Sequence, residues 1–577
     1  MTRLILALCA CLALLSGWLS IESQPREDLA GLTDGKGMPG RASVSHVPCM
    51  SYAPYRRKGD APWQATRPIR PEQIREDLRL LMPLTRCIRT YGVEHGLEAV
   101  PAIARELGFK VRLGVWIGGD RVGNQAHLEQ GIALAREYRD VVDMLVVGNE
   151  VLLRGELPLH ELTGLLDQAR AAQPAPVAYA DVWEFWQRHA STLKSHVDVA
   201  AIHVLPYWED HPVGIDHALA HVKAVLHTMQ RELAPLPVWL AETGWPSAGR
   251  QRGAARPGPA EQARFVREWV QVARPDDNLI EAFDQPWKRD LEGAMGGHWG
   301  LLDAEGRAKF GWTGALPADI ALRPALAGLL TGALLGGVFG LYLATRALLN
   351  RDDATLTKQK TPADCARLTK PTPKKIEFAL VGGLAGACLG PLIQAQLEMV
   401  LIWGRTPIEI AAASAYALLC LVCAVLALRQ CMVGQDGRSL QVFMTLLLLS
   451  TAGLALALVV DGRYRPLVWP LLIAPAVALL LPAAQVRISA GRSVLRGADL
   501  LGIRRDPLLS SRPIALLGVS LCLICSGLLV QQEGWDNTQA RYCALTWVLL
   551  GLGALRQLRT TCRPDSAGGV QHAQQKK

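Results

Sequence analysis

Charged residues are scarce in this chain of 577 residues. Asp, Glu, Lys and Arg make up 20% of it, whereas hydrophobic residues make up 50%, and the mean hydropathy is positive, at +0.16. So long a chain exceeds one ordinary domain, and so apolar a chain is not expected to be wholly soluble. The charge is also unevenly spread: the stretch 45–312 has a soluble mixture of residues, whereas 324–555 is dominated by Leu, Ala, Gly and Val. The sequence therefore predicts two regions in two solvents.

Cysteine is nearly absent from the first region, which holds only Cys49 and Cys87 of the 13 in the chain. These two fall on adjacent predicted strands, so a disulfide is one alternative; buried free thiols are the other, and we favour them. The C-x-x-C pairs at 420–423 and 522–525 lie within apolar runs, where cysteine is typically a small packing residue. We therefore predict no metal and no cofactor.

Long apolar runs fill the second region. Most approach the ~20 residues that a helix needs to cross a bilayer, so we predict a multi-pass membrane domain of about seven helices over 322–577. The runs are 324–348, 378–402, 407–428, 439–460, 466–486, 513–531 and 542–556. A further run at 4–21 follows a basic start and has no good A-x-A cleavage site, so 1–24 is predicted to be a membrane anchor or a signal segment, with the anchor favoured.

Glycines recur in the first two of these C-terminal runs at intervals of four residues. The spacing places them on one face of each helix, which lets helix backbones approach closely in lipid. They are Gly328, Gly332, Gly336 and Gly340 in the first run, and Gly382, Gly386 and Gly390 in the second.

Loop charge predicts the orientation of the membrane domain. The connections at one side carry 20 Lys and Arg residues together, whereas those at the other side carry 4. Cytoplasmic loops are the ones enriched in Lys and Arg, so we expect a cytoplasmic C-terminus and a first region on the far side of the membrane. The net charge of +9 is then a consequence of topology, and membrane lipid rather than nucleic acid is the expected partner.

The first region alternates short apolar runs with amphipathic segments. Eight strand candidates, from VPCMSYAPY to NLIEAFDQPW, alternate with helix candidates such as PEQIREDLRLLMPL, VPAIARELG, HLEQGIALAREYRD and PAEQARFVREWVQVA. Continuous apolar strands with helices between them indicate a parallel sheet, and eight repeats in about 270 residues indicate a (β/α)8 TIM barrel. The predicted fold is thus α/β: a barrel over 45–315, followed by an all-α membrane domain.

Two carboxylates end predicted strands across the barrel mouth. Glu150 follows the fourth strand run, VDMLVVGNE, and Glu242 lies at the same level of the seventh, PVWLAETGWPS. A carboxylate at the tip of a dry strand is costly unless it is paired or used. One protonated and one ionised carboxyl group on opposed strands can cleave a glycosidic bond. A retaining mechanism predicts roughly 5–5.5 Å between the groups, and inversion a wider gap.

The motifs VVGNE, AETGWPS, IRTYG, FDQPWK and HWGLLDAEG together resemble glycoside hydrolase family 17, the β-1,3-glucanases and β-glucanosyltransferases. The resemblance covers about 45–312 and implies that Glu150 is the general acid/base and Glu242 the nucleophile of a retaining double displacement. It also implies that Asn149 holds the sugar 2-hydroxyl. The other residues that it implies at the substrate site are Arg89, Tyr91, Tyr207, Lys288 and Glu292.

A Tyr or Arg hydrogen-bonded to Glu242 would keep that carboxylate ionised. The resemblance implies Tyr207 as a tyrosine near the nucleophile, whereas His203 stands where plant-type members carry other residues. We interpret His203 as a satisfied group behind the catalytic residues rather than as a proton donor.

Tryptophan is concentrated in the first region, with 11 of 16 between Trp63 and Trp312. Aromatic faces stack on pyranose rings, so tryptophans beyond strand ends suit a glucan cleft; Trp245 and Trp287 are predicted to bind substrate. Trp239 and Trp269 fall within a strand and a helix, where packing is expected. The tryptophans beyond strand ends are Trp116, Trp183, Trp186, Trp208, Trp245, Trp287 and Trp299.

Three functions are compatible with these residues: a membrane-bound transglycosylase that branches or cyclises periplasmic β-1,3-glucan, an endo-β-1,3-glucanase, and a glucan-binding sensor without catalysis. The architecture resembles bacterial membrane proteins of the family associated with periplasmic β-glucan synthesis, which favours the first. The predicted cytoplasmic loops lack the Gln-x-x-Arg-Trp motif of processive synthases and are too short for a nucleotide-sugar domain. A separate glucan synthase is therefore an expected partner, and the bacterial inner membrane is the expected location.

Overall fold

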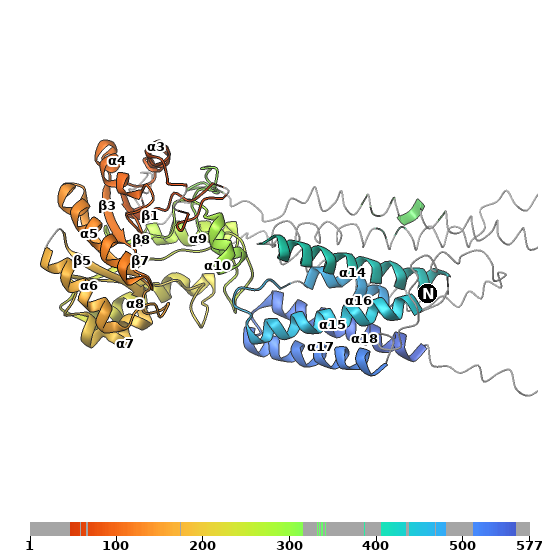
Figure 1. The fold of residues 1–577 in the computed structure, drawn as a ribbon. Helices are drawn as coiled ribbons and strands as arrows, with labels where there is room; N and C mark the ends of the chain where they lie inside the picture. Colours follow the sequence, from red (N-terminus) through yellow and green to blue (C-terminus); the bar gives the residue numbers. More distant parts are fainter. Residues whose placement is uncertain are drawn as a thin grey trace, which may run out of the picture. The chain divides into compact units, whose positions relative to one another are not determined.

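The computed structural model describes residues 47–57, 59–64, 67–172, 175–314, 406–433, 438–467, 469–480 and 512–560, with isolated positions between 330 and 386. The chain divides into two compact units, Pro25–Asp319 and a unit that includes Ile320–Lys577 (Figure 1). The predicted segment 1–24 and most of the predicted helices at 324–348 and 378–402 lie outside the described residues.

Eight parallel strands form the centre of the first unit, in the order β7-β6-β5-β4-β3-β2-β1-β8 (Figure 1). A parallel bridge between Thr243, directly after β7, and Leu279 in β8 joins the two ends of the sheet. The predicted (β/α)8 barrel is confirmed, and each of the eight predicted runs contains one strand. The strands are β1 (Cys49–Ser51), β2 (Cys87–Arg89), β3 (Lys110–Val115), β4 (Val142–Asn149), β5 (Val177–Val182), β6 (Val199–His203), β7 (Val238–Glu242) and β8 (Asn278–Leu279).

One α-helix follows each of the first seven strands. These are α3 (Pro71–Leu81), α4 (Val100–Leu107), α5 (Arg121–Glu137), α6 (Leu159–Ala172), α7 (Trp183–Leu193), α8 (Ile215–Leu233) and α9 (Pro259–Val270). The predicted start of α5 at residue 127 is six residues late, because the side chain of Asp120 accepts a hydrogen bond from the Val122 amide and begins the helix there. Between β8 and residue 314, where the described part of the barrel ends, the helices are the short η3 (Pro286–Lys288), α10 (Arg289–Glu292) and η4 (Ala294–Gly297).

A disulfide joins Cys49 in β1 to Cys87 in β2. The favoured expectation of free thiols is therefore wrong, and the alternative holds. The two strands pair directly, with Met50 opposite Ile88, so the preceding residues of each strand face one another at bonding distance. The described cysteines of the helical unit, at 420, 423, 522, 525 and 543, are unbonded and buried, in agreement with their predicted packing role.

Five helices make up the described part of the second unit. They are α14 (Pro407–Val433), α15 (Arg438–Val460), α16 (Trp469–Leu480), α17 (Arg512–Glu533) and α18 (Thr538–Thr560). Within the described residues, three stretches are long and apolar enough to cross a membrane: Pro407–Leu428, Ser439–Val460 and Arg512–Glu533. The helix predicted at 542–556 extends from 538 to 560, because polar and charged residues at both ends continue the helix beyond the apolar run. These helices fit the predicted helical membrane domain.

Glycines bring two segments of this unit into close contact. A Cβ atom added to Gly386 would lie 1.9 Å from the carbonyl oxygen of Gly332 and 2.9 Å from Cα of Gly336. Only glycine fits such an approach, as the four-residue spacing predicts for these three positions.

Candidate active site

Parallel pairing brings the predicted catalytic residues to one end of the barrel. In the strand register Asn149 pairs with Ala180 on β5, and His203 at the end of β6 pairs with Glu242 at the end of β7. Glu150 follows β4 directly. The C-terminal ends of barrel strands are where TIM-barrel enzymes build their active sites.

Glu242 is almost completely buried, with 4% of its surface exposed. Its Oε1 accepts a hydrogen bond from Arg89 Nη1 at 2.5 Å and one from the Tyr91 hydroxyl at 2.8 Å. Arg89 is itself buried, and its Nη2 donates to Asn149 Oδ1 at 2.5 Å. One guanidinium from β2 therefore holds side chains from β4 and β7 in fixed positions.

These contacts determine the charge state of Glu242. Burial raises the pKa of this carboxyl, but its polar neighbours His203, Arg89, Tyr91 and Lys288 together lower it by more, so the pKa lies below its ordinary value. Burial and the Glu242 charge raise the pKa of Tyr91 well above its ordinary value, so the phenol stays protonated and donates. Glu242 is therefore ionised and fixed in place, as a nucleophile requires.

Glu150 lies on a strained turn. Its φ is +54°, a rare value for a residue other than glycine, and Gly148 just before it has φ of +84°. The amide of Glu150 donates to the carbonyl oxygen of Ala180 at 2.7 Å, and Arg154 donates to the carbonyl oxygen of Asn149. Strained backbone held by surrounding bonds is concentrated at active sites, and here it directs the carboxylate toward β6 and β7.

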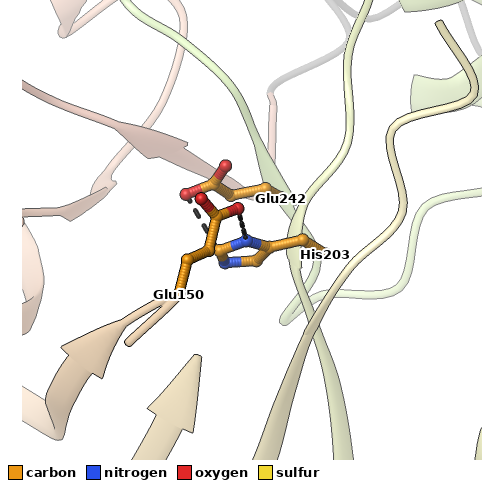
Figure 2. A group of neighbouring side chains, drawn as sticks. All are labelled: Glu150, His203 and Glu242. Carbon is orange, nitrogen blue, oxygen red and sulfur yellow. Dashed lines mark hydrogen bonds and ion pairs between the residues drawn. The ribbon is translucent and has the colours of Figure 1, made fainter. Parts of the chain in front are cut away.

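His203 lies between the two carboxylates, and Figure 2 shows its ring beside both. Nδ1 is 2.8 Å from Glu150 Oε1, and Nε2 is 3.5 Å from Glu242 Oε1. A ring nitrogen of His203 and one carboxylate oxygen from each of Glu150 and Glu242 all lie within 4.8 Å of one another. Three such atoms are a possible ligand set for a cation. The hydrogen bonds of Glu150 to His203 and of Glu242 to Arg89 are sufficient to explain why the three side chains lie together. The absence of a metal stays a prediction.

Lys288 forms an ion pair with a further carboxylate, Glu281, and its charge also acts on Glu242 and Glu292. Its Nζ lies 2.8 Å from Glu281 Oε2. Burial lowers the pKa of Lys288, but the charges of Glu281, Glu292 and Glu242 raise it by more. Burial, only partly offset by Lys288, raises the pKa of both Glu281 and Glu292 to about 7. Lys288 and Glu292 thus belong to the electrostatic environment of Glu242, and their contact with substrate stays a prediction.

Two acidic residues of this mouth were missed by the sequence analysis. Glu281 directly follows the β8 region, and Asp181 lies at the end of β5, fully buried and hydrogen-bonded to the Tyr179 hydroxyl. Burial, with a contribution from the Glu150 charge, raises the pKa of Asp181 to about 6. Both stand at the end of an apolar run, which is the signal that identified Glu150 and Glu242, so the same rule could have found them.

The predicted substrate contacts divide by burial. Tyr207 is 0% exposed, and its hydroxyl donates to the carbonyl oxygen of Arg250 at 2.6 Å; Trp245 is 1% exposed. These two side chains are therefore buried in the barrel, and their predicted contact with substrate stays a prediction. Trp287 remains partly exposed and contacts the exposed Trp63, with ring centroids 5.3 Å apart.

The other tryptophans divide in the same way. Trp116, Trp183 and Trp208 are partly exposed, whereas Trp186 and Trp299 are buried. Trp239 and Trp269 are buried, at 2% and 1% exposure, which confirms that they pack in the interior.

A TIM barrel with carboxylates at the ends of β4 and β7 is the arrangement that TIM-barrel glycoside hydrolases use. Residues 49–300 match the family described as the BtgE/BtgC glycoside hydrolase domain. The match supports the resemblance to glycoside hydrolase family 17 that the motifs indicate.

Curated relatives agree with this assignment. The chain is 26% identical over 267 residues to the probable beta-glucosidase btgE of Aspergillus fumigatus, an alignment that covers 45% of this chain and 46% of that protein. It is 26% identical over 270 residues to glucan 1,3-beta-glucosidase BGL2 of Candida albicans, with 41% and 84% covered. The chain thus spans less than half the length of the btgE relative. The bacterial origin stays a prediction.

Among solved structures, the chain is similar to a glycoside hydrolase family 17 beta-1,3-glucanosyltransferase from Rhizomucor miehei. The identity is 22%, the TM-score is 0.41, and the match covers 47% of this chain and 99% of that one.

Proposed function

We propose that this protein is a membrane-bound, retaining β-1,3-glucan transglycosylase. The observation that carries the mechanism is that an oxygen of Glu150 and an oxygen of Glu242 lie within 4.8 Å of each other. Retaining enzymes place their two carboxyl groups roughly 5–5.5 Å apart, whereas inverting enzymes need roughly 6.5–9.5 Å to hold a water between them. The spacing here favours direct attack by one carboxylate on the anomeric carbon.

The two carboxylates have different environments that match two roles. Glu242 is buried among Arg89, Tyr91 and His203, which lower its pKa and keep it ionised as the nucleophile. Glu150 has a side chain that is 22% exposed, so it can reach the leaving oxygen of a bound chain. Glu150 gives its proton to that oxygen while Glu242 forms a covalent glycosyl ester, and Glu150 then removes a proton from the acceptor.

The proposed substrate is a β-1,3-glucan. Support comes from the names of the relatives, which include glucan 1,3-beta-glucosidases, and from partly exposed tryptophans such as Trp116, Trp208 and Trp287 beyond the strand ends. Asn149 remains the proposed ligand of the sugar 2-hydroxyl, because its amide nitrogen has no partner among the described residues while its oxygen is held by Arg89.

The helical unit supports transfer rather than simple hydrolysis. A degradative hydrolase would need one anchor, whereas this chain has three described stretches that are candidate membrane spans. Trp312 is only about a dozen residues from the first predicted membrane helix, so the barrel would work near newly exported polymer, whose hydroxyl groups compete with water for the ester. The proposed location is a bacterial inner membrane, with the barrel periplasmic, the C-terminus cytoplasmic and a glucan synthase as partner.

The products from a labelled β-1,3-gluco-oligosaccharide test this proposal. Membranes that contain the full-length protein are incubated with the oligosaccharide at millimolar concentration, with the Glu242→Gln protein as a matched control. We expect elongated, branched or cyclic products that the control does not form. If the protein yields only shortened, unbranched fragments at high acceptor concentration, it is a hydrolase; if it yields no product, the glucan assignment fails.

A further inference from the structure

The imidazole of His203 contacts the two catalytic carboxylates unequally (Figure 2). Its Nδ1 makes a short hydrogen bond of 2.8 Å with Glu150 Oε1, whereas Nε2 lies 3.5 Å from Glu242 Oε1, at the outer limit of such a bond. The side chain of His203 is 0% exposed, so bulk water does not compete for either nitrogen. Neighbouring side chains therefore decide which nitrogen carries the proton.

Arg89 favours a proton on Nδ1 of the neutral imidazole. Its Nη1 lies 3.5 Å from His203 Nε2, and a guanidinium carries a permanent positive charge and only donors. A lone pair on Nε2 is attracted to that group, whereas a proton on Nε2 would face another N–H. Glu242 Oε1 would favour the opposite tautomer, but it already accepts shorter bonds from Arg89 and Tyr91.

Each catalytic carboxylate therefore has one oxygen that is held and one that is free. Oε1 of Glu242 accepts from Arg89 and Tyr91, and Oε1 of Glu150 is bonded to His203. Within the part of the chain that the structure describes, no hydrogen bond reaches Oε2 of either residue. A carboxyl group that accepts a hydrogen bond at one oxygen carries its own proton on the other.

We propose that His203 is a positioning residue that occupies Oε1 of Glu150 and thereby reserves Oε2 for proton transfer. Held as the Nδ1–H tautomer by Arg89, it donates to Oε1 whether Glu150 is ionised or protonated. The inference rests on the proposed function and deepens it, because it assigns the two oxygens of Glu150 different tasks. It also replaces our interpretation of His203 as a merely satisfied group.

Both steps of the reaction then use the same oxygen of Glu150. In the first, Oε2 gives its proton to the leaving oxygen as the glycosidic bond breaks and Glu242 Oε2 bonds the anomeric carbon. In the second, Glu150 Oε2 takes the proton of the acceptor hydroxyl as that oxygen attacks the anomeric carbon and the bond to Glu242 breaks. His203 neither gains nor loses a proton.

Two substitutions separate the Nδ1 contact from the bulk of the ring. In His203→Asn the amide nitrogen takes the place of Nδ1 and can donate to Glu150. In His203→Gln the amide reaches the place of Nε2, and the donor to Glu150 is lost. The full-length proteins are assayed in membranes with a β-1,3-gluco-oligosaccharide, whose leaving group needs a proton, and with a dinitrophenyl β-gluco-oligosaccharide, whose leaving group needs none.

We expect His203→Gln to lower kcat/KM by about 10²-fold with the oligosaccharide, the size of a general-acid contribution, but by less than about threefold with the dinitrophenyl donor. His203→Asn should keep most of the activity on both donors. An equal loss on both donors, or equal behaviour of the two variants, overturns the proposal, because His203 would then act through the fold or through Glu242.

Nitrogen NMR of histidine-labelled full-length protein gives a readout that needs no turnover. The His203 resonances are identified as those missing from His203→Asn, and we expect the Nδ1–H tautomer. An Nε2–H tautomer overturns the proposal. Lack of turnover of both donors by the unsubstituted protein would instead reject the proposed function, and the tautomer would still decide the role of His203.

Discussion

The barrel and the helical unit satisfy their polar side chains in opposite ways. In the barrel, Arg89 bonds Asn149 and Glu242, which are 60 and 153 residues away in the sequence. In the helices, many Ser and Thr hydroxyls donate to the carbonyl oxygen four residues earlier; examples are Thr445 to Gln441 and Ser450 to Leu446. A hydroxyl in lipid has no water to bond and turns to its own helix.

Apolar side chains show the complementary difference. Barrel strands bury theirs almost completely, whereas the candidate membrane helices expose large ones, such as Leu418 at 60% and Ile524 at 58%. In water such exposure would be unfavourable, and in hydrocarbon it costs nothing. Polar side chains from distant parts of the sequence converge where the barrel strands end, which is where a reaction can be catalysed. In the helical unit most polar side chains bond within their own helix.

The largest expected effect concerns the catalytic pair. Glu242→Gln should lower turnover by about 10⁴-fold or more, because no nucleophile remains to form the glycosyl ester. Glu150→Ala should still form that ester from a dinitrophenyl donor and then release it slowly. Mass spectrometry of the trapped protein measures both. Label on a residue other than Glu242 would mean that the nucleophile is assigned wrongly.

A change confined to the helical unit should leave the chemistry intact. Gly386→Leu places a side chain where the carbonyl oxygen of Gly332 would lie 1.9 Å from Cβ, so we expect loss of assembled protein from the membrane. Leu334→Ile, at a position 66% exposed, is the control. The yield of folded protein from detergent extracts is the measurement, and equal yields would remove the packing role.

The disulfide should stabilise only the barrel. Replacing Cys49 and Cys87 with Ala opens a loop with a sequence separation of 38 residues and should lower the free energy of unfolding by about 2–4 kcal/mol. Thermal unfolding of the two units, followed by limited proteolysis, is the test. A matched pair, Cys420→Ala with Cys423→Ala, changes unbonded thiols and should leave barrel stability unchanged; equal effects would contradict the assignment.

The smallest expected effect is on the pH dependence of barrel stability. The pKa of Glu281 is raised from 4.5 to about 7, so the folded barrel binds this proton more tightly than the unfolded chain. The stability that protonated Glu281 contributes is fully present below about pH 4.5 and is lost as the pH rises through about 7. Glu281→Gln should therefore flatten the fall in unfolding temperature between these values, and an unchanged slope would exclude a titrating Glu281.

The strand positions, and the places of Glu150 and Glu242 at strand ends, could be predicted because both depend on local pattern. An apolar run that ends in an acid identifies a strand tip, and this rule gave Glu150 and Glu242 their correct strands. Contacts between strands could not be read in this way. Arg89 was predicted near the substrate, but its guanidinium bonds Glu242 and Asn149, a result of register and side-chain length.

Two further features could not be read from local pattern: the burial of Tyr207 and Trp245, and the disulfide. Tyr207 and Trp245 both follow strands, yet their side chains pack beneath the mouth, because a loop after a strand can turn either way. Strand adjacency suggested that Cys49 and Cys87 could bond, but periodicity does not give the facing direction of two strands. That direction comes from the pairing of Met50 with Ile88.

The carboxylates of the barrel mouth outnumber its cations, which has a consequence for inhibition. A cation that resembles the positively charged sugar of the transition state, such as a protonated iminosugar, should pair with the ionised Glu242 and be held tightly there. A screen for inhibitors should therefore begin with basic sugar mimics. The acidic groups are Glu150, Asp181, Glu242, Glu281 and Glu292, and the permanent cations beside them are Arg89 and Lys288.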